Sequence, residues 1–485
     1  MKDDFKILFQ NGLSKFQSGD FLGSEEIFIY LLKKNPKKNE LYTYLIPSLI
    51  NQNKLKLAKK YSKVLYSLDS HYKEIGLIYL GIISQKLKNF KESATFFHES
   101  LEINPGNDQA LLNLGVVYHN LDNNLKAIEY TIQSIKINKN NSIAYQNLAS
   151  FLEDENRIDE AIHYLNIGLS INDRDFNALH ALSLLQLLKS DYANGYINYE
   201  QRFFSSYLKP KYTHINRLLL GSNIKGKKIL VWHEQGLGDT IQFSRLVNKL
   251  VNLGGIVTLE VQKPLENFLI DQFKFEIVSE IKEQNFDYQI PLLSLLNFFQ
   301  VNENNIPMYE KYFECNKDKF LFWKKKLSLS KDKINIGLSV SGNINHKKEY
   351  RRKISLEKFS KFTDKFRIFL IQKEISSEDK LVVDQNNEII FLGVDKDWSD
   401  FSDTSAMVEN MDIIISIDSS LIHLSGAMNK NSYLLLSNPA DWRWGQKNRD
   451  NTYWYDSVKL IRQKTPKIWN EVIEKLYSSL LNLKK

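Results

Sequence analysis

The octapeptide HEQGLGDT (233–240) places two glycines and an acid directly after the apolar run KILVW. A glycine turn between a strand and a helix usually cradles phosphate on backbone N–H groups. The third glycine of a dinucleotide fingerprint is missing and Asp239 would repel phosphate, which argues against a nicotinamide or flavin enzyme. Gly236 and Gly238 instead predict a tight turn, and Asp239 is expected to cap the helix that follows. Two interpretations stay open: Asp239 is only a cap, or the turn also presents it as a base.

The stretch DIIISIDSSLIHLSGAMNK (412–430) is expected to be a strand, a short turn and a helix that begins at Leu421. Hydroxyls, free N–H groups at a helix start and an imidazole together make a diphosphate cradle. The residues that would form it are Ser419, Ser420, His423 and Gly426. The alternative is a helix cap with a packed histidine ring.

Three further segments are weaker candidates. Arg351 and Arg352, in the loop SVSGNINHKKEYRRKISLEKF, would neutralise phosphate, or they belong to a solvated charged loop. Asp403 and Thr404 stand at a predicted helix start, where they cap the helix and are candidates to touch a ligand. The aromatic segment 438–455 is expected to pack across an interface, with stacking of Trp442 or Trp444 on a sugar or base as the alternative. No metal-binding motif occurs, so phosphate charge would be offset by arginine, lysine and helix termini.

These loops follow short apolar strands that alternate with helices. The expected strands are 227–234, 255–262, 286–293, 334–342, 366–374, 388–393, 412–418 and 432–437. Such alternation predicts parallel sheets, here in two Rossmann-like lobes at 213–325 and 330–485. Ligands bind at the carboxyl ends of parallel strands, so facing lobes would form a cleft lined by the candidate loops.

The first part of the chain repeats with a period of 34 residues. Three successive repeats end in similar pentapeptides, SLEIN, SIKIN and GLSIN, so that Ile103, Ile137 and Ile171 are spaced by 34 residues. Small residues keep the same spacing at Gly81, Gly115 and Ala149. A helix–turn–helix unit of this length is the tetratricopeptide repeat, which predicts an α-solenoid over residues 1–208. Its groove either binds a peptide or protein partner or only scaffolds. The aromatic last repeat, 189–203, is expected to dock the solenoid onto the next domain.

Composition limits the class of protein. The chain has 485 residues, 43% of them hydrophobic, and a net charge of +8 spread in mixed-sign runs. No basic face of the kind that binds nucleic acid is indicated. One cysteine excludes an internal disulfide, and neither a signal peptide nor a membrane span is evident. We therefore expect a cytoplasmic protein.

Together these motifs resemble bacterial tetratricopeptide-repeat proteins with a glycosyltransferase domain of the heptosyltransferase type. The resemblance rests on WHEQGLGDTIQFSR, FDYQIPLLSLL, RRKISLEKF, FSDTSAMVENMDIIISIDSSLIHLSGAM, DWRW and YWYDSVKLIRQ. The O-linked N-acetylglucosamine transferases share this plan of repeats joined to two GT-B lobes.

The resemblance implies an inverting, metal-independent glycosyltransferase with the GT-B fold and no resident cofactor. The second lobe would bind a nucleotide-diphosphate sugar at Ser419, Ser420, His423 and Gly426, and Asp239 matches the proposed general base of heptosyltransferases. The chain departs from the family at Ser419, at Ser425 and at Lys353, where Thr, Ala and Ser are usual. An active transferase holding a protein or glycan acceptor is one hypothesis. The other is an interaction protein whose transferase lobes have lost activity.

Overall fold

The computed structural model describes residues 2–68, 70–206, 208–282, 285–307, 311–342, 349–446 and 449–483. The chain divides into two compact units, with the boundary between Arg174 and Asp175.

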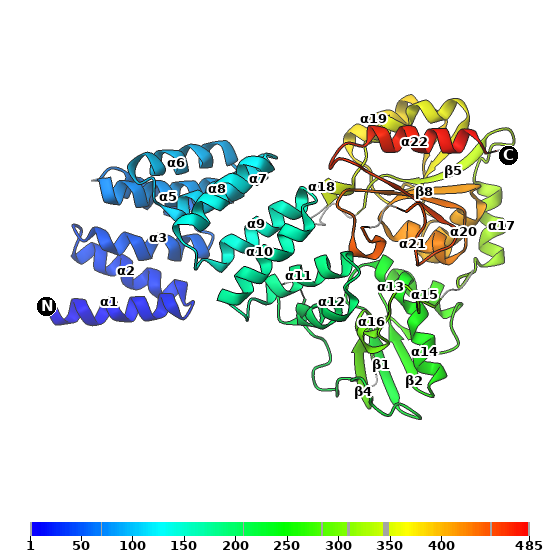
Figure 1. The fold of residues 1–485 in the computed structure, drawn as a ribbon, viewed down its shortest axis with the longest axis horizontal. Helices are drawn as coiled ribbons and strands as arrows, with labels where there is room; N and C mark the ends of the chain where they lie inside the picture. The colour runs from blue at the N-terminus through cyan, green and yellow to red at the C-terminus, as the bar shows by residue number, and fades with distance from the viewer. Residues whose placement is uncertain are drawn as a thin grey trace. The chain divides into compact units, whose positions relative to one another are not determined.

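The described part of the first unit is entirely helical, and successive helices pack in pairs (Figure 1). Its helices are α1 (Lys2–Gln17), α2 (Phe21–Lys34), η1 (Asn39–Leu41), α3 (Tyr42–Asn51), α4 (Leu55–Tyr66), α5 (Ser70–Lys86), α6 (Phe90–Ile103), α7 (Asp108–Asn120), α8 (Asn124–Ile137), α9 (Ser142–Asp154) and α10 (Ile158–Ile171). Helices α6, α8 and α10 end at the three isoleucines that define the sequence period. The predicted helical repeat array is therefore present.

Two features explain the 34-residue period. The small residues allow close helix packing: a Cβ on Gly115 would lie 2.3 Å from Thr131 Oγ1, and one on Gly81 would lie 2.6 Å from the Phe97 ring. The turn inside each hairpin also contains one residue with positive φ, between 58° and 82°. These residues are Gly19, Asn53, Lys88, Asp122, Asn156 and Ser190. Because Ser190 continues the series, the hairpin after Arg174 keeps the repeat geometry although it belongs to the second compact unit.

The second unit begins with that hairpin and continues with a four-stranded parallel sheet in the order β3-β2-β1-β4. We call the sheet and its helices, residues 228–298, the first lobe. The elements from the hairpin through this lobe are α11 (Phe176–Leu188), α12 (Tyr192–Tyr199), η2 (Glu200–Phe203), β1 (Lys228–Trp232), α13 (Leu237–Phe243), η3 (Ser244–Leu246), α14 (Val247–Asn252), β2 (Ile256–Glu260), α15 (Lys263–Ile270), β3 (Glu276–Val278), β4 (Tyr288–Pro291) and α16 (Ser294–Phe298).

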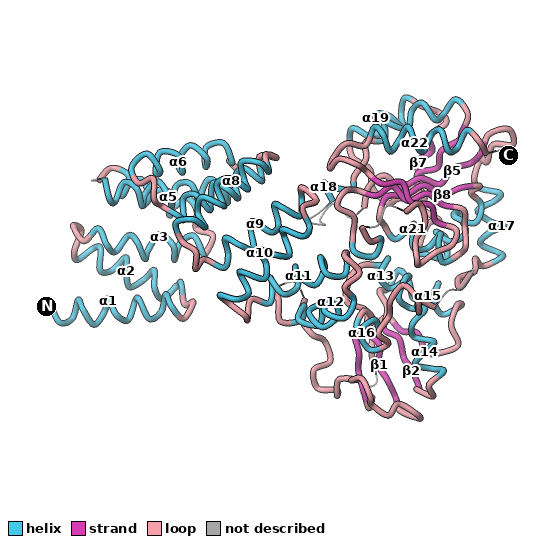
Figure 2. Tube along the Cα trace, viewed as in Figure 1, coloured by secondary structure: helices cyan, strands magenta, loops and turns pink. Residues whose placement is uncertain are grey.

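Helix α17 (Lys317–Lys326) leads to a six-stranded parallel sheet in the order β10-β9-β8-β5-β6-β7. The magenta strands labelled β5, β7 and β8 in Figure 2 belong to this sheet. We call residues 334–481 the second lobe. Its elements are β5 (Ile334–Ser339), α18 (Glu349–Arg352), η4 (Leu356–Asp364), β6 (Phe366–Leu370), α19 (Ser377–Gln385), β7 (Ile389–Phe391), α20 (Phe401–Asn410), β8 (Ile413–Ile417), α21 (Ser420–Ala427), β9 (Ser432–Leu436), η5 (Trp442–Trp444), β10 (Val458–Arg462) and α22 (Asn470–Leu481).

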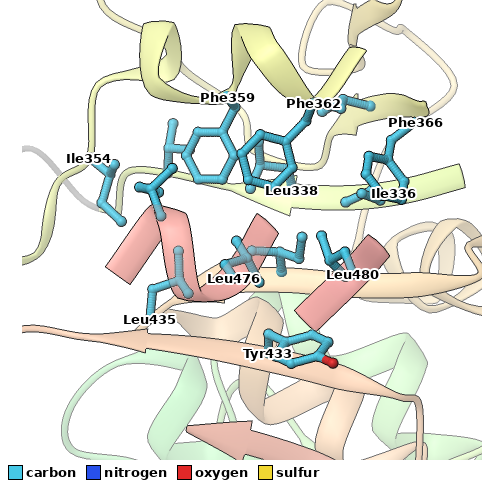
Figure 3. Packing of buried hydrophobic residues seen from close by; sticks show 14 of the residues in the cluster. Ile336, Leu338, Ile354, Phe359, Phe362, Phe366, Tyr433, Leu435, Leu476 and Leu480 are labelled. Atoms are coloured by element: carbon cyan, nitrogen blue, oxygen red, sulfur yellow. The ribbon is translucent and has the colours of Figure 1, made fainter. Parts of the chain in front are cut away.

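The strands of both sheets are apolar because helices cover them. In the second lobe, Ile336 and Leu338 of β5 pack against Phe359 and Phe362 of η4, with Leu476 of α22 in the same cluster (Figure 3). Burial on both faces is typical of parallel sheets, and it explains why the strands read as continuous apolar runs. All eight predicted strands are present; the short β3 and the strand β10 were not predicted.

Candidate functional site

The order of strands singles out one edge in each lobe. Strand order reverses between β1 and β4 in the first lobe and between β8 and β5 in the second. Open parallel sheets bind ligands at the carboxyl ends of the strands beside such a reversal. The glycine loop follows β1, the arginine loop follows β5, and the Asp418–Ser420 turn follows β8. The topology therefore places all three loops at the sheet edges where ligands bind in open parallel sheets.

The glycine loop forms the predicted capped turn. The chain leaves β1 at Trp232 and enters α13 at Leu237, with Gly236 as the N-cap residue. Asp239 Oδ2 accepts a hydrogen bond from the Gly236 backbone N–H at 2.8 Å. The capping role of Asp239 is therefore confirmed, and its role as a base stays a prediction.

The turn after β8 is also built as a helix cap. Ser419 is the N-cap of α21: its Oγ accepts from the Leu421 N–H at 3.3 Å and lies 2.9 Å from Ser416 Oγ. The helix begins at Ser420, one residue earlier than predicted. Gly426 lies under the ring of Tyr455, since an added Cβ would be 2.5 Å from Tyr455 Cγ. The structure thus gives Gly426 a packing role, whereas Ser419 and Ser420 stand at the helix start.

The two turns meet. A Cβ on Gly238 of the first lobe would lie 2.8 Å from His423 Cδ2 and 3.4 Å from Ser420 Cα of the second lobe. The absence of a side chain at Gly238 is what lets α13 approach α21 this closely. Residues 185 positions apart in the sequence are therefore in contact, and the two candidate turns lie side by side.

His423 is buried and neutral in this contact. Its Nδ1 lies 3.0 Å from the Tyr455 hydroxyl, and its ring stacks on Trp444 with centroids 5.3 Å apart. Its Nε2 lies 3.8 Å from Asp418 Oδ1, beyond hydrogen-bond distance. Burial, with a further contribution from Arg443, lowers the pKa of His423 to about 3. The imidazole therefore stays uncharged at neutral pH.

Arg443, which the sequence analysis did not single out, connects the lobes at this site. Its Nη2 pairs with Asp239 Oδ1, and its Nη1 donates to Asp441 Oδ1 at 2.8 Å. Burial alone would lower the pKa of Arg443, but Asp239 and Asp441 raise it above its usual value. Next to it, Trp442 stacks on Phe243 of α13 with an interplanar angle of 4°. The aromatic segment thus packs across the lobe interface, as predicted.

A second carboxyl group near this contact, that of Asp418, has a raised pKa. Burial and the charge of Asp441 raise the pKa of Asp418 to about 6, against the opposing effect of Arg352 and Arg443. Arg352 Nη1 donates to the Asp418 carbonyl at 2.6 Å, and its Nε donates to Glu349 at 2.6 Å. Arg352 therefore borders the site.

The other weak candidates lie apart from this contact. Arg351 Nε donates to the Tyr350 hydroxyl at 3.3 Å, and the preceding loop residues 343–348 lie outside the described residues. Asp403 is buried at the start of α20, where it pairs with Lys319 at 2.7 Å and accepts from Trp323 Nε1. Burial would raise the pKa of Asp403, but Lys319 and Ser399 lower it to about 2.

Thr404 has a structural role beside Asp403. Its Oγ1 accepts from Trp398 Nε1 at 2.9 Å and lies 3.1 Å from the Asp400 carbonyl. The capping part of the prediction is confirmed for Asp403, whose Oδ2 accepts from the backbone N–H of the N-cap residue Asp400 at 3.4 Å. Thr404 bonds within the helix and to Trp398 and does not cap it. Contact of either residue with a ligand stays a prediction.

The last helical hairpin and η2, which follows it, also contact the glycine loop. Arg202 of η2 forms two hydrogen bonds to Glu234, at 2.6 and 2.9 Å, and neither side chain is exposed. Glu234 also accepts from the Leu293 N–H at 3.0 Å, and Gln235 donates to the Tyr199 hydroxyl at 2.7 Å. The predicted docking of this hairpin is confirmed, and the buried Arg202–Glu234 pair is a new element of the site.

A groove of about 700 Å³ lies elsewhere in the second lobe. It is lined by Glu357, Lys358, Ser360, Lys361, Val382, Gln385, Asn386, Asn470, Ile473 and Glu474. None of the predicted site residues lines this groove. Across the described ranges, no three or more His, Cys, Asp and Glu side chains are arranged to hold a metal ion, and metal independence stays a prediction. None of the helices described is long and apolar enough to cross a membrane.

Comparison with known proteins identifies the repeats. The tetratricopeptide-repeat family model matches residues 108–141 and 143–175. The helical region is thus a tetratricopeptide-repeat array, which suggests a protein-interaction scaffold. A comparison with curated proteins gave no match.

Solved structures with some similarity include tetratricopeptide-repeat proteins. PilF of Pseudomonas aeruginosa has 19% sequence identity and a TM-score of 0.36, over 42% of this chain and 91% of that one. A thermophilic tetratricopeptide-repeat protein of Thermus thermophilus has 16% identity and a TM-score of 0.33, over 38% and 99% of the two chains. One from Parabacteroides merdae has 20% identity and a TM-score of 0.33, over 43% and 82%.

Proposed function

We propose that the second unit is a glycosyltransferase with two GT-B lobes, which moves a sugar from a nucleotide-diphosphate donor to a hydroxyl acceptor. The observation that carries the proposal is the contact of Gly238 with His423. It joins a loop containing a carboxylate to a helix start containing two serines, at the ligand-binding edges of two parallel sheets.

In this proposal each side of the contact has its own task. The N-terminus of α21, with Ser419 and Ser420, binds the diphosphate through backbone N–H groups and hydroxyls. Arg352, tied to the Asp418 carbonyl, adds positive charge at the same edge. His423 is neutral, so it acts by packing and hydrogen bonding.

Asp239 is the general base. The acceptor oxygen attacks the anomeric carbon, its proton passes to Asp239, and the bond from that carbon to the diphosphate oxygen breaks. The nucleoside diphosphate leaves from the face opposite to the attack, which inverts the anomeric configuration. General base catalysis of this kind contributes roughly 10²- to 10⁴-fold to the rate.

A thermal-shift screen of the full chain against nucleotide-diphosphate sugars tests the donor site. All seven tryptophans follow residue 174, so tryptophan fluorescence reports on the unfolding of the second unit alone. A donor at about 100 times its dissociation constant should stabilise that unit by roughly 2.7 kcal/mol. With the donor identified, Asp239→Asn should abolish transfer and retain donor binding. Full activity of this variant would refute the assignment of the base.

A second candidate function is a protein-interaction scaffold with inactive transferase lobes. The pairing of Asp239 with Arg443 favours it, because the carboxylate is engaged and not open to an acceptor. The repeat array provides the surface for a protein or glycan partner in both cases. If no nucleotide sugar shifts the melting of a well-folded sample, the scaffold is the better description.

A further inference from the structure

We propose that Arg443 is a ligand of the donor diphosphate and that, before the donor binds, it blocks Asp239. This inference rests on the proposed function and adds an order of events to it. The donor must bind first, because its diphosphate takes Arg443 away from the base.

The contacts of Arg443 support such an exchange. One nitrogen of its guanidinium, Nη2, is used by Asp239 of the first lobe, while Nη1 and the backbone N–H are held by Asp441 at 2.8 and 3.0 Å. The remaining nitrogen, Nε, is buried and has no hydrogen-bond partner among the described residues, in a side chain that is only 9% exposed. Asp441 therefore anchors the arginine to its own lobe, and Nη2 is the donor that would pass from Asp239 to a new acceptor.

The same contacts explain why Asp239 is blocked. Its Oδ2 accepts the Gly236 N–H and its Oδ1 accepts from Arg443, and the side chain is 14% exposed. An acceptor hydroxyl needs one of these oxygens as its proton acceptor. It reaches Oδ1 only after the guanidinium has left.

A diphosphate is the chemical group that fits the exchange. A guanidinium presents its N–H groups in a planar fork that matches phosphate oxygens. The turn that would bind the diphosphate, Ser419–Ser420, lies against Gly238, one residue from Asp239. A diphosphate there carries more negative charge than one carboxylate, so it can replace Asp239 as the partner of Arg443.

Calorimetric titration of the full chain tests the exchange. The probes are UDP, GDP, ADP, CDP and inorganic pyrophosphate, with wild type, Asp239→Asn, Arg443→Gln and the control Arg449→Gln. Arg449 is in the same segment, and its Nε donates to the Asn451 carbonyl. For the probe that binds wild type best, we expect roughly tenfold or tighter binding by Asp239→Asn, because the competing carboxylate charge is gone. We expect Arg443→Gln to bind roughly 10- to 100-fold more weakly, as a lost charge-assisted hydrogen bond predicts, and Arg449→Gln to bind as wild type does.

Each result decides the matter. Unchanged or weaker binding by Asp239→Asn overturns the block, and a variant that gains affinity cannot be misfolded. Tighter binding by Asp239→Asn with unchanged binding by Arg443→Gln overturns Arg443 as the ligand. Either result leaves the proposed donor site standing. If wild type binds none of the probes, the proposed donor site and this inference both fail.

Discussion

Removing Arg202 should destabilise the second unit strongly, because it leaves a buried carboxylate behind. Arg202→Met takes two hydrogen bonds from Glu234 and leaves it, among the described residues, only the Leu293 N–H. Neither side chain of the pair is exposed. Breaking a buried ion pair from one side costs about 3–5 kcal/mol, a large share of a folding free energy of roughly 5–15 kcal/mol.

Urea unfolding followed by tryptophan fluorescence measures this loss in the second unit alone. With an m-value of about 3 kcal/mol per molar, the midpoint should fall by about 1–1.7 M. The double variant Arg202→Met/Glu234→Leu should be more stable than Arg202→Met, since no charge is left unpaired. Lys361→Met is the matched control: it breaks an exposed pair with Glu474, whose side chain is 68% exposed, and its effect should be small. If the stability lost in Arg202→Met/Glu234→Leu equals the sum of the losses in Arg202→Met and in Glu234→Leu, the two side chains are not coupled and the reasoning is wrong.

Three further predictions concern the same unit. Gly238→Ala places a Cβ 2.8 Å from His423 Cδ2, and the ring is held by Trp444 and Tyr455; we expect a loss of about 1–3 kcal/mol, and an unchanged melting temperature would contradict the close contact. The His423 ring should show the NMR shifts of a neutral imidazole from pH 8 to 5, because burial lowers its pKa to about 3. The unfolded chain has a histidine pKa near 6.5 and so binds more protons in this window; the contribution of His423 to stability therefore falls as the pH drops below about 6.5. Burial raises the pKa of the Cys315 thiol from 9.0 to about 11. Fewer thiols are then ionised at pH 8, although each thiolate is a stronger nucleophile, so reaction with a disulfide reagent should be about tenfold slower in the folded protein than in guanidinium; equal rates would show an open thiol.

The sequence predicts the elements well where one local pattern defines them. Ile103, Ile137 and Ile171 mark helix ends because a repeat must place the same residue at the same point of each hairpin. The strands were found because both of their faces are buried, so that they read as apolar runs. The three-residue β3 is too short for such a run, and the charged residues Lys459 and Arg462 interrupt β10.

The site was predicted in part. The loops with Asp239, Ser419 and His423 follow apolar strands, and that position is readable from sequence. The partners of these residues are not readable. Arg443 lies 204 positions from Asp239, and no periodicity connects them. The same holds for Arg202 and Glu234, because a buried ion pair looks like two ordinary surface charges until the chain is folded.

The hairpin α11–α12 limits how such a chain can vary during evolution. Tyr199 of this hairpin and Arg202 of η2, directly after it, bond to the glycine loop, so this end of the helical region is fixed to the first lobe by side chains of its own. The earlier hairpins pack on one another, and each repeats the same two features, a small residue at the helix contact and a turn residue with positive φ. Duplication or loss of a whole 34-residue repeat upstream of α11 preserves both features and leaves the contacts of the glycine loop unchanged. We therefore expect relatives to differ in the number of repeats on that side and to retain the final hairpin.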